Sequence, residues 1–132
     1  MTIKTYYSAS IRGEYGEEAS DYDIFLNCQR AVERGMIIRN YFDVFVPHEH
    51  EPDMREAWRQ GLLPIETILA LDCAIVERSS ILWVDSDPEE SEGVQREIEC
   101  ADNEGIEIVL IYDLSNSELD TLCKKLLDSI RR

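Results

Sequence analysis

The sequence predicts an α/β fold, a three-layer sandwich in which helices cover both faces of a parallel sheet of four to five strands. Short apolar runs with strand character alternate four times with longer stretches whose apolar residues recur at helical spacing. Such alternation is typical of right-handed βαβ units. The chain has 132 residues, 44% of them hydrophobic, which suits one core and a single domain over residues 1–132.

The first half of the chain predicts two strands that flank one helix. The strands are rich in aromatic and β-branched residues, and Pro47 closes the second of them. Ser20 and Asp23 can cap the start of the helix, and Gly35 can end it. The elements expected here are a strand over residues 3–9, a loop over 10–20, a helix over 21–34 and a strand over 41–46.

The second half predicts further helices that alternate with two strands. Pro64 suits the first turn of a helix, and Ser117 with Asp120 can cap the last one. A nearly continuous apolar run over residues 106–112 indicates a strand buried on both faces of the sheet. The other expected elements are a short helix over 53–60, a helix over 65–76, a strand over 80–84, a helix that ends near Asn103 with Gly105 after it, and a helix up to Ile130. This order indicates a Rossmann-like (flavodoxin-like) arrangement.

The charge of the chain limits its partners. The formal net charge is -15, from 28 acidic and 13 basic residues. We therefore expect no polymeric nucleic acid as a ligand, because phosphate backbones are bound by basic surfaces. One Arg and a few backbone amides are enough to hold a small phosphorylated molecule. The chain has no signal-peptide core at its N-terminus and no apolar run of membrane-spanning length, so we expect a cytoplasmic protein without membrane contact.

The four cysteines are far apart, and each falls within a predicted helix among apolar neighbours. No Cys-x-x-Cys pair occurs. This pattern is typical of reduced, buried thiols and not of a disulfide framework or a zinc site. The prediction covers Cys28, Cys73, Cys100 and Cys123.

Two other groups of residues contain side chains that can bind metals. His48 and His50 flank Glu49, but alternating residues on a surface loop are more often solvated than bound to a metal. The acidic loop over residues 85–92 lacks the spacing and the turn glycine of a calcium loop, so we expect it to be solvated too. We predict no metal and no cofactor.

Two carboxylates stand out as candidates for chemistry. Asp72 falls on the apolar stripe of the helix over 65–76, where a carboxylate is costly unless it is paired or used, so structural and functional roles both stay open. Glu97 faces the inner side of the next helix near its N-terminus, at the carboxyl end of a strand. The loop Ser10-Ile11-Arg12-Gly13 offers a hydroxyl and a guanidinium. Two carboxylates with an anion-binding loop suit displacement at the anomeric carbon of a sugar.

Standard nucleotide motifs do not occur in the chain. It has neither G-x-x-x-x-G-K-[ST] nor G-x-G-x-x-G after a strand, and it has no serine nucleophile elbow. P-loop hydrolysis, dinucleotide binding and serine-based acyl transfer are therefore disfavoured.

The residues Tyr6-Tyr7-Ser8-Ala9-Ser10-Ile11-Arg12-Gly13, then Asp72, then Ser91-x-Gly93-x-x-x-Glu97-x-x-x-Ala101 resemble the nucleoside 2-deoxyribosyltransferase-like superfamily. The nearest branch is the 2'-deoxynucleoside 5'-phosphate N-hydrolases, whose first loop also reads Ser-Ile-Arg-Gly. The resemblance runs from residue 5 to about residue 112. Two positions depart from the hydrolase pattern, because Ser79-Ser80 stands where a second Asp is usual and Gln95 stands where a Gly is usual.

The resemblance implies a role for each residue of these motifs. Glu97 would be the nucleophile that captures the deoxyribosyl carbon, and Asp72 would assist as acid or base. Tyr6 or Tyr7 would lie by the sugar or base, and His48 near the nucleobase. The 5'-phosphate would be held by Ser10, Arg12, Gly13 and Ser91, with Ile11 and Gly93 in the same two motifs.

The resemblance also implies a function. We expect an enzyme that hydrolyses the N-glycosidic bond of a (deoxy)nucleoside 5'-monophosphate through a covalent glycosyl-Glu97 ester, releasing free base and sugar phosphate. The alternatives are a nucleoside deoxyribosyltransferase that uses the same site, a non-catalytic nucleotide-binding or regulatory domain, and a purely structural partner protein. Relatives are dimers or larger, with a neighbour contributing to the pocket, so the resemblance implies a homodimer or a larger homo-oligomer.

Overall fold

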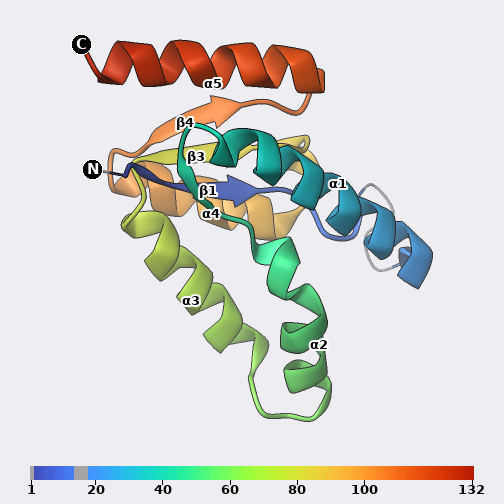
Figure 1. Ribbon diagram of the computed structural model, residues 1–132. Coiled ribbons are helices and arrows are strands. Elements are labelled where there is room, and N and C mark those ends of the chain that lie inside the picture. The colour runs from blue at the N-terminus through green and yellow to red at the C-terminus, as the bar shows by residue number, and fades with distance from the viewer. Residues whose placement is uncertain (1, 14–17) are drawn as a thin grey trace.

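The computed structural model describes residues 2–13 and 18–132, and it confirms the α/β fold predicted from the sequence (Figure 1). Four parallel strands of the described chain form one sheet in the order β2-β1-β3-β4. Flavodoxin-like sheets have the same order over their first four strands. The strands are β1 (Lys4–Ser8), β2 (Asp43–Phe45), β3 (Ile81–Val84) and β4 (Glu107–Leu110).

Helices cover both faces of the sheet, which makes three layers. Figure 1 shows α5 and α1 on one face and α3 and α4 on the other, with α2 and α3 forming an arm that extends away from the sheet. The helices are α1 (Asp21–Arg39), α2 (Glu51–Arg59), α3 (Ile65–Glu77), α4 (Glu92–Asn103) and α5 (Asn116–Ile130), with 3-10 turns at Pro47–His50 and Pro88–Glu90. Within the described residues, none of these helices is long and apolar enough to span a membrane.

The two faces of the sheet form two separate hydrophobic clusters. Consecutive side chains of a strand point to opposite faces, so Tyr7 and Trp83 pack under α1 and α5 while Tyr6 and Leu82 pack against α3 and α4. All four side chains are buried. Because side chains alternate along the strand, the Tyr6 side chain lies on the face of the sheet that α3 and α4 cover. These helices carry Asp72 and Glu97.

Helix α1 is longer than the sequence predicted, because Gly35 does not end it. The helix continues to Arg39, and Gly35 is buried against β2 and the loop after it. A Cβ added at Gly35 would lie 2.7 Å from Cγ2 of Val46, so glycine is needed here for close packing. The predicted cap of Ser20 with Asp23 is confirmed. The predicted loop over 10–20 includes residues 14–17, which lie outside the described residues.

Three local predictions in the second half are wrong. Strand β4 is at the edge of the sheet, so it is not buried on both faces, and Glu107 and Leu110 are exposed. Ser115, and not Ser117, caps α5 with a reciprocal bond to Glu118, because the helix begins one residue earlier than Ser117. Pro64 is the N-cap of α3 and not its first residue.

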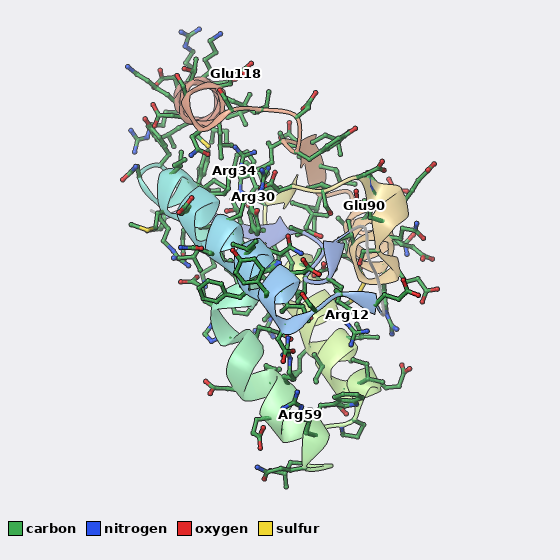
Figure 2. The ribbon with its side chains drawn as sticks, turned by 90° about the vertical axis from the view of Figure 1, so that its right-hand side faces the viewer. Arg12, Arg30, Arg34, Arg59, Glu90 and Glu118 are labelled. Carbon is green, nitrogen blue, oxygen red and sulfur yellow. A yellow bond between two sulfur atoms is a disulfide. The ribbon has the colours of Figure 1, made fainter. Side chains whose placement is uncertain are left out.

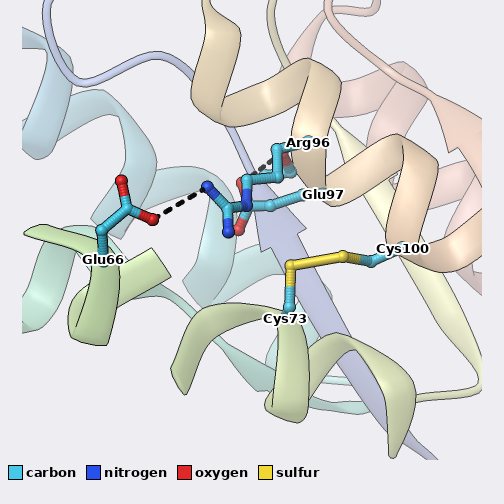
Figure 3. The surroundings of a disulfide bond; sticks show 6 residues. Glu66, Cys73, Arg96, Glu97 and Cys100 are labelled. Atoms are coloured by element: carbon cyan, nitrogen blue, oxygen red, sulfur yellow. Dashed lines mark hydrogen bonds and ion pairs between the residues drawn. A yellow bond between two sulfur atoms is a disulfide. The ribbon is translucent and has the colours of Figure 1, made fainter. Parts of the chain in front are cut away.

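The prediction that all cysteines are reduced is wrong for two of them. Cys73 of α3 and Cys100 of α4 form a disulfide, with their Cα atoms 6.0 Å apart (Figure 3). Cys28 and Cys123 are free thiols, as predicted, and Cys123 is fully buried. The sequence did not reveal this pair, because its two cysteines are 27 positions apart. They meet because the topology brings α3 and α4 together on one face of the sheet.

Candidate functional site

A cavity of about 880 Å³ lies beyond the carboxyl ends of β1 and β3. This is the point where the strand order reverses, and open α/β sheets hold their ligands there. Every residue that the sequence proposed for the site lines this one cavity, so the fold brings all of them together. They are Tyr6, Tyr7, Ser10, Ile11, Arg12, Gly13, His48, Asp72, Ser91, Gly93 and Glu97.

Glu97 is held in the second turn of α4 by contacts with β1. Ser8 Oγ donates a hydrogen bond of 2.9 Å to Glu97 Oε1. The Tyr6 hydroxyl lies beside the same carboxylate and lowers its pKa by a weak hydrogen bond, although it has no well-aligned partner among the described residues. Strand β1 thus supplies one hydroxyl that orients the carboxylate, from Ser8, and a second beside it, from Tyr6.

The pKa values of both carboxylates are raised. Burial raises the pKa of Glu97 from 4.5 to about 7, with a smaller contribution from the charge of Asp72, against the hydrogen bonds of Tyr6 and Ser8. Burial, and then the charge of Glu51, raises the pKa of Asp72 from 3.8 to about 6. Burial therefore outweighs the favourable helix N-terminus that the sequence suggested for Glu97, which lies in the second turn where that effect has weakened.

Two carboxylic groups in one cavity can divide the work of acid and base. With pKa values of about 6 and about 7, both groups exchange protons near neutral pH, which unperturbed carboxylates do not. Beyond the effect of burial, the charge of Asp72 adds to the raised pKa of Glu97, whereas the charge that raises the pKa of Asp72 is that of Glu51. Carboxyl groups with raised pKa values are typical of sites that pass protons during a reaction.

Hydrogen bonds fix the loop that follows β1. Gly13 N donates a hydrogen bond of 2.8 Å to Ser10 Oγ, and Ser10 N donates one of 3.1 Å to Ser86 Oγ. Gly13 has a φ of +67°, which favours glycine at this position. The Ser10 hydroxyl accepts from Gly13, and its own hydrogen has no acceptor among residues 2–13 and 18–132. Asn27 Nδ2 donates a hydrogen bond of 3.0 Å to Ile11 O, which ties the loop to α1.

The N-terminus of α4 faces the same cavity. Ser91 is the N-cap, and its Oγ accepts a hydrogen bond of 3.3 Å from Val94 N. Ser91, Gly93 and Val94 all line the cavity. The free N–H groups of a helix start attract anions, but the carboxylates of Glu90 and Glu92 line the cavity at the same end of α4.

His48 is buried and not solvated, which corrects one prediction from the sequence. It is the second residue of the 3-10 turn after β2, and its side chain packs edge to face on Tyr7 and lines the cavity. Burial lowers the pKa of His48 from 6.5 to about 4, so the ring is neutral at pH 7. Within the described residues neither ring nitrogen has a hydrogen-bond partner of good geometry, and weak hydrogen bonds to the backbone of Ser10 and Ala9 raise the pKa against the larger effect of burial.

Asp85 is also buried, although the sequence suggested a solvated acidic loop. The carboxylate accepts hydrogen bonds from Arg34 Nε at 2.9 Å and Arg34 Nη2 at 3.0 Å, and from the Tyr7 hydroxyl. Arg30 adds a bond of 3.2 Å from the partly exposed side. Burial, and then the Asp85 charge, raises the pKa of Tyr7. This network fixes the end of β3 beneath the cavity, because Asp85 follows β3 directly.

Five residues of α2 line the cavity but were missed from the sequence. They are Glu51, Met54, Arg55, Trp58 and Arg59. Met54, Arg55 and Trp58 share one helical face, and that spacing was the signal that could have identified them. Figure 2 shows Arg12 on the loop after β1 and Arg59 farther out on α2. Arg12 lies close enough to Glu51 of α2 to lower the pKa of its carboxyl, against the larger effect of burial, which raises it.

The chemistry of the cavity is that of carboxylates, hydroxyls and guanidinium groups. Within residues 2–13 and 18–132, no cluster of three or more His, Cys, Asp or Glu side chains is arranged to hold a metal ion. Comparison of the chain with protein-family models, curated proteins and solved structures finds no match to any of them.

Proposed function

We propose that the protein cleaves the N-glycosidic bond of a (deoxy)nucleoside 5'-monophosphate and releases free base and sugar phosphate. The observation that carries the proposal is one cavity lined by Asp72, by Glu97 and by the loop from Ser10 to Gly13. Cleavage at an anomeric carbon uses two carboxylic groups, and a phosphorylated sugar needs an anion site beside them. The cavity combines both features at the switch point of the sheet.

In the first step, the Glu97 carboxylate attacks C1' of the sugar. The bond from C1' to the base nitrogen breaks, and its electron pair leaves with the base, which takes a proton from Asp72. The product is a glycosyl ester on Glu97. The hydrogen bond from Ser8 holds one carboxylate oxygen, which keeps the nucleophile in a single orientation.

In the second step, water attacks the same carbon of the ester. Asp72, now ionised, accepts a proton from this water, and Glu97 leaves as a free carboxylate. Two displacements on the same carbon retain its configuration. If a second base enters in place of water, the same ester gives transfer instead of hydrolysis.

The 5'-phosphate is assigned to the anion site between the first loop and α4. The Ser10 hydroxyl, the backbone N–H groups at the start of α4 and the Arg12 guanidinium line the cavity around it. His48 and Trp58 offer ring edges and faces for the base on the side of α2. The net charge of -15 makes such a local anion site necessary, because the surface as a whole repels phosphate.

The test is release of free base. The protein is incubated with a panel of deoxynucleosides and their 5'-monophosphates, and the products are separated by chromatography. Wild type is expected to release base from at least one monophosphate, and Glu97→Gln to lower the rate by about 10³-fold or more. Glu99→Gln, the same change on the exposed side of α4, is the matched control and should keep full activity.

Three outcomes of this assay are informative. Release of base from monophosphates but not from nucleosides, lost in Arg12→Ala and kept in Arg78→Ala, supports the phosphate site. Transfer of the sugar to an added second base identifies a transferase. No release from any member of the panel, at high protein concentration, contradicts the proposal and leaves a domain that binds nucleotides without turning them over.

A further inference from the structure

The disulfide lies directly beside the two carboxylates of the site. Cys73 follows Asp72 in α3, and Cys100 lies three positions after Glu97 on the same side of α4. Figure 3 shows the bond crossing from α3 to α4 close to Glu97. Each half of the proposed catalytic pair therefore stands within one helical turn of a bonded cysteine.

Apart from the disulfide, α3 packs against α4 and the sheet mainly near its C-terminal end, where Ile75 and Val76 join a hydrophobic cluster. Val76, near its C-terminal end, is the one residue of α3 that is fully buried. Farther toward the N-terminus, Ile65 and Leu71 are 51% and 48% exposed. The Arg96–Glu66 ion pair to α4 is 3.7 Å long, and its side chains are 44% and 78% exposed, so it adds little. The disulfide is thus the strong link between α3 and α4 at the level of Asp72.

We propose that Cys73 and Cys100 are a redox-modification site that regulates the cavity, an inference that rests on the proposed function. In the oxidised protein, the bond holds Asp72 over the cavity opposite Glu97. In the reduced protein, α3 keeps its anchor at Val76 but its middle moves away from α4, and Asp72 leaves the position that acid and base catalysis need.

The modifying reagent belongs to the class of small thiols and their disulfides. Two thiol molecules, RSH, reduce the bond and give two cysteine thiols and one RSSR, so that two electrons and two protons pass to Cys73 and Cys100. A small disulfide reverses the reaction. Both cysteines are partly exposed, so such a reagent can reach them, whereas Cys123 is buried.

The first experiment measures base release across a series of glutathione ratios. The oxidised fraction is read in parallel from maleimide labelling by mass spectrometry. Activity is expected to follow the oxidised fraction and to fall about tenfold or more on full reduction. The activity of the double variant Cys73→Ser, Cys100→Ser should equal that of reduced wild type and should not depend on the glutathione ratio. The activity of the control variant Cys28→Ser should depend on that ratio as wild type does. Equal activity of oxidised and reduced wild type would overturn the inference.

A second experiment does not depend on catalysis. Amide hydrogen exchange is compared between oxidised and reduced wild type. Residues 65–77 of α3 are expected to exchange about tenfold faster or more after reduction, while residues 116–130 of α5 stay unchanged. Equal exchange in α3 overturns the redox inference, even if base is released. Faster exchange in α3 without base release from either form supports the redox site and contradicts only the proposed function.

Discussion

Ser8 and Glu97 are 89 positions apart in the sequence, and a hydrogen bond of 2.9 Å joins Ser8 Oγ to Glu97 Oε1. Ser8 is the last residue of β1, and its side chain is buried, so water does not compete for the bond. The contact lowers the pKa of a carboxyl group that burial raises. It therefore favours the ionised Glu97 that the proposed reaction needs.

Replacing Ser8 with Ala should raise the pKa of Glu97 further above about 7. Activity needs ionised Glu97, so the acid limb of the pH–rate profile should move to higher pH. The rate at pH 7 should fall about tenfold, as expected for one hydrogen bond to a charged group. Thr5→Val removes another buried hydroxyl of β1, one that bonds Asp43 O, and should leave the profile unchanged. An unshifted limb in Ser8→Ala would contradict this role.

Glu97→Gln should make the protein more stable at alkaline pH. The folded-state pKa of about 7 lies above the usual 4.5, so between these values the folded protein binds the extra proton. The free energy of unfolding of wild type therefore falls as pH rises through this window, and the cost is fully present above pH 7. Glutamine carries no charge and avoids this cost. The free energy of unfolding of Glu97→Gln should therefore exceed that of wild type by about 3 kcal/mol at pH 8, and the difference should disappear below about pH 4.5.

Urea unfolding at pH 4.5 and pH 8 measures this difference. Glu99→Gln, which is exposed on the same helix, should change stability little at either pH. A gain for Glu97→Gln that is equal at both pH values would mean that burial does not set the pKa of this carboxyl.

Arg34→Met should destabilise the fold far more than Arg30→Met, although both arginines contact Asp85. The Arg34 side chain is 3% exposed and donates two bonds to the carboxylate, so its loss leaves the buried Asp85 charge with the half-exposed Arg30 as its remaining cationic partner, at about 3–5 kcal/mol. The Arg30 side chain is 53% exposed, and its loss should cost about 1 kcal/mol or less. Denaturant titration compares the two variants, and equal losses would refute the assigned difference.

Gly35→Ala should destabilise the protein although alanine favours helices. The new Cβ would lie 2.7 Å from Val46 Cγ2, and the resulting overpacking should cost about 1–3 kcal/mol. Val46→Ala removes the clashing methyl group, so the double variant should lose less than the sum of the single losses. Stabilisation by Gly35→Ala alone, as helix propensity predicts, would contradict the close packing of α1 on Val46.

Local sequence patterns predicted the order of the elements because those patterns depend on neighbours. The cap of Ser20 with Asp23 lies within one helical turn, and its prediction is confirmed. Gly35 was misjudged because its role comes from contact with Val46, eleven positions away on a different element. The edge position of β4 depends on the order of strands in the sheet, which no local pattern contains.

The candidate site was predicted residue by residue, but its supports were not. Spacing and resemblance identified Asp72 and Glu97, and one cavity contains both. The bond from Ser8 to Glu97, the Arg34–Asp85 pair and the disulfide join residues 89, 51 and 27 positions apart. The sequence around each partner gave no sign of its contact. Asp85 begins an acidic loop that is typical of solvated residues, and the cysteines have apolar neighbours. Only the packed topology pairs them.

The proposed reaction depends on a covalent ester between Glu97 and the sugar. Wild type is mixed with a monophosphate that it cleaves and quenched in acid within the first turnover, and its peptides are weighed by mass spectrometry. The account predicts a deoxyribose phosphate adduct on the peptide that contains Glu97, which appears with free base and is absent in Glu97→Gln. Release of free base without any adduct, at an undiminished rate in Glu97→Gln, would contradict it.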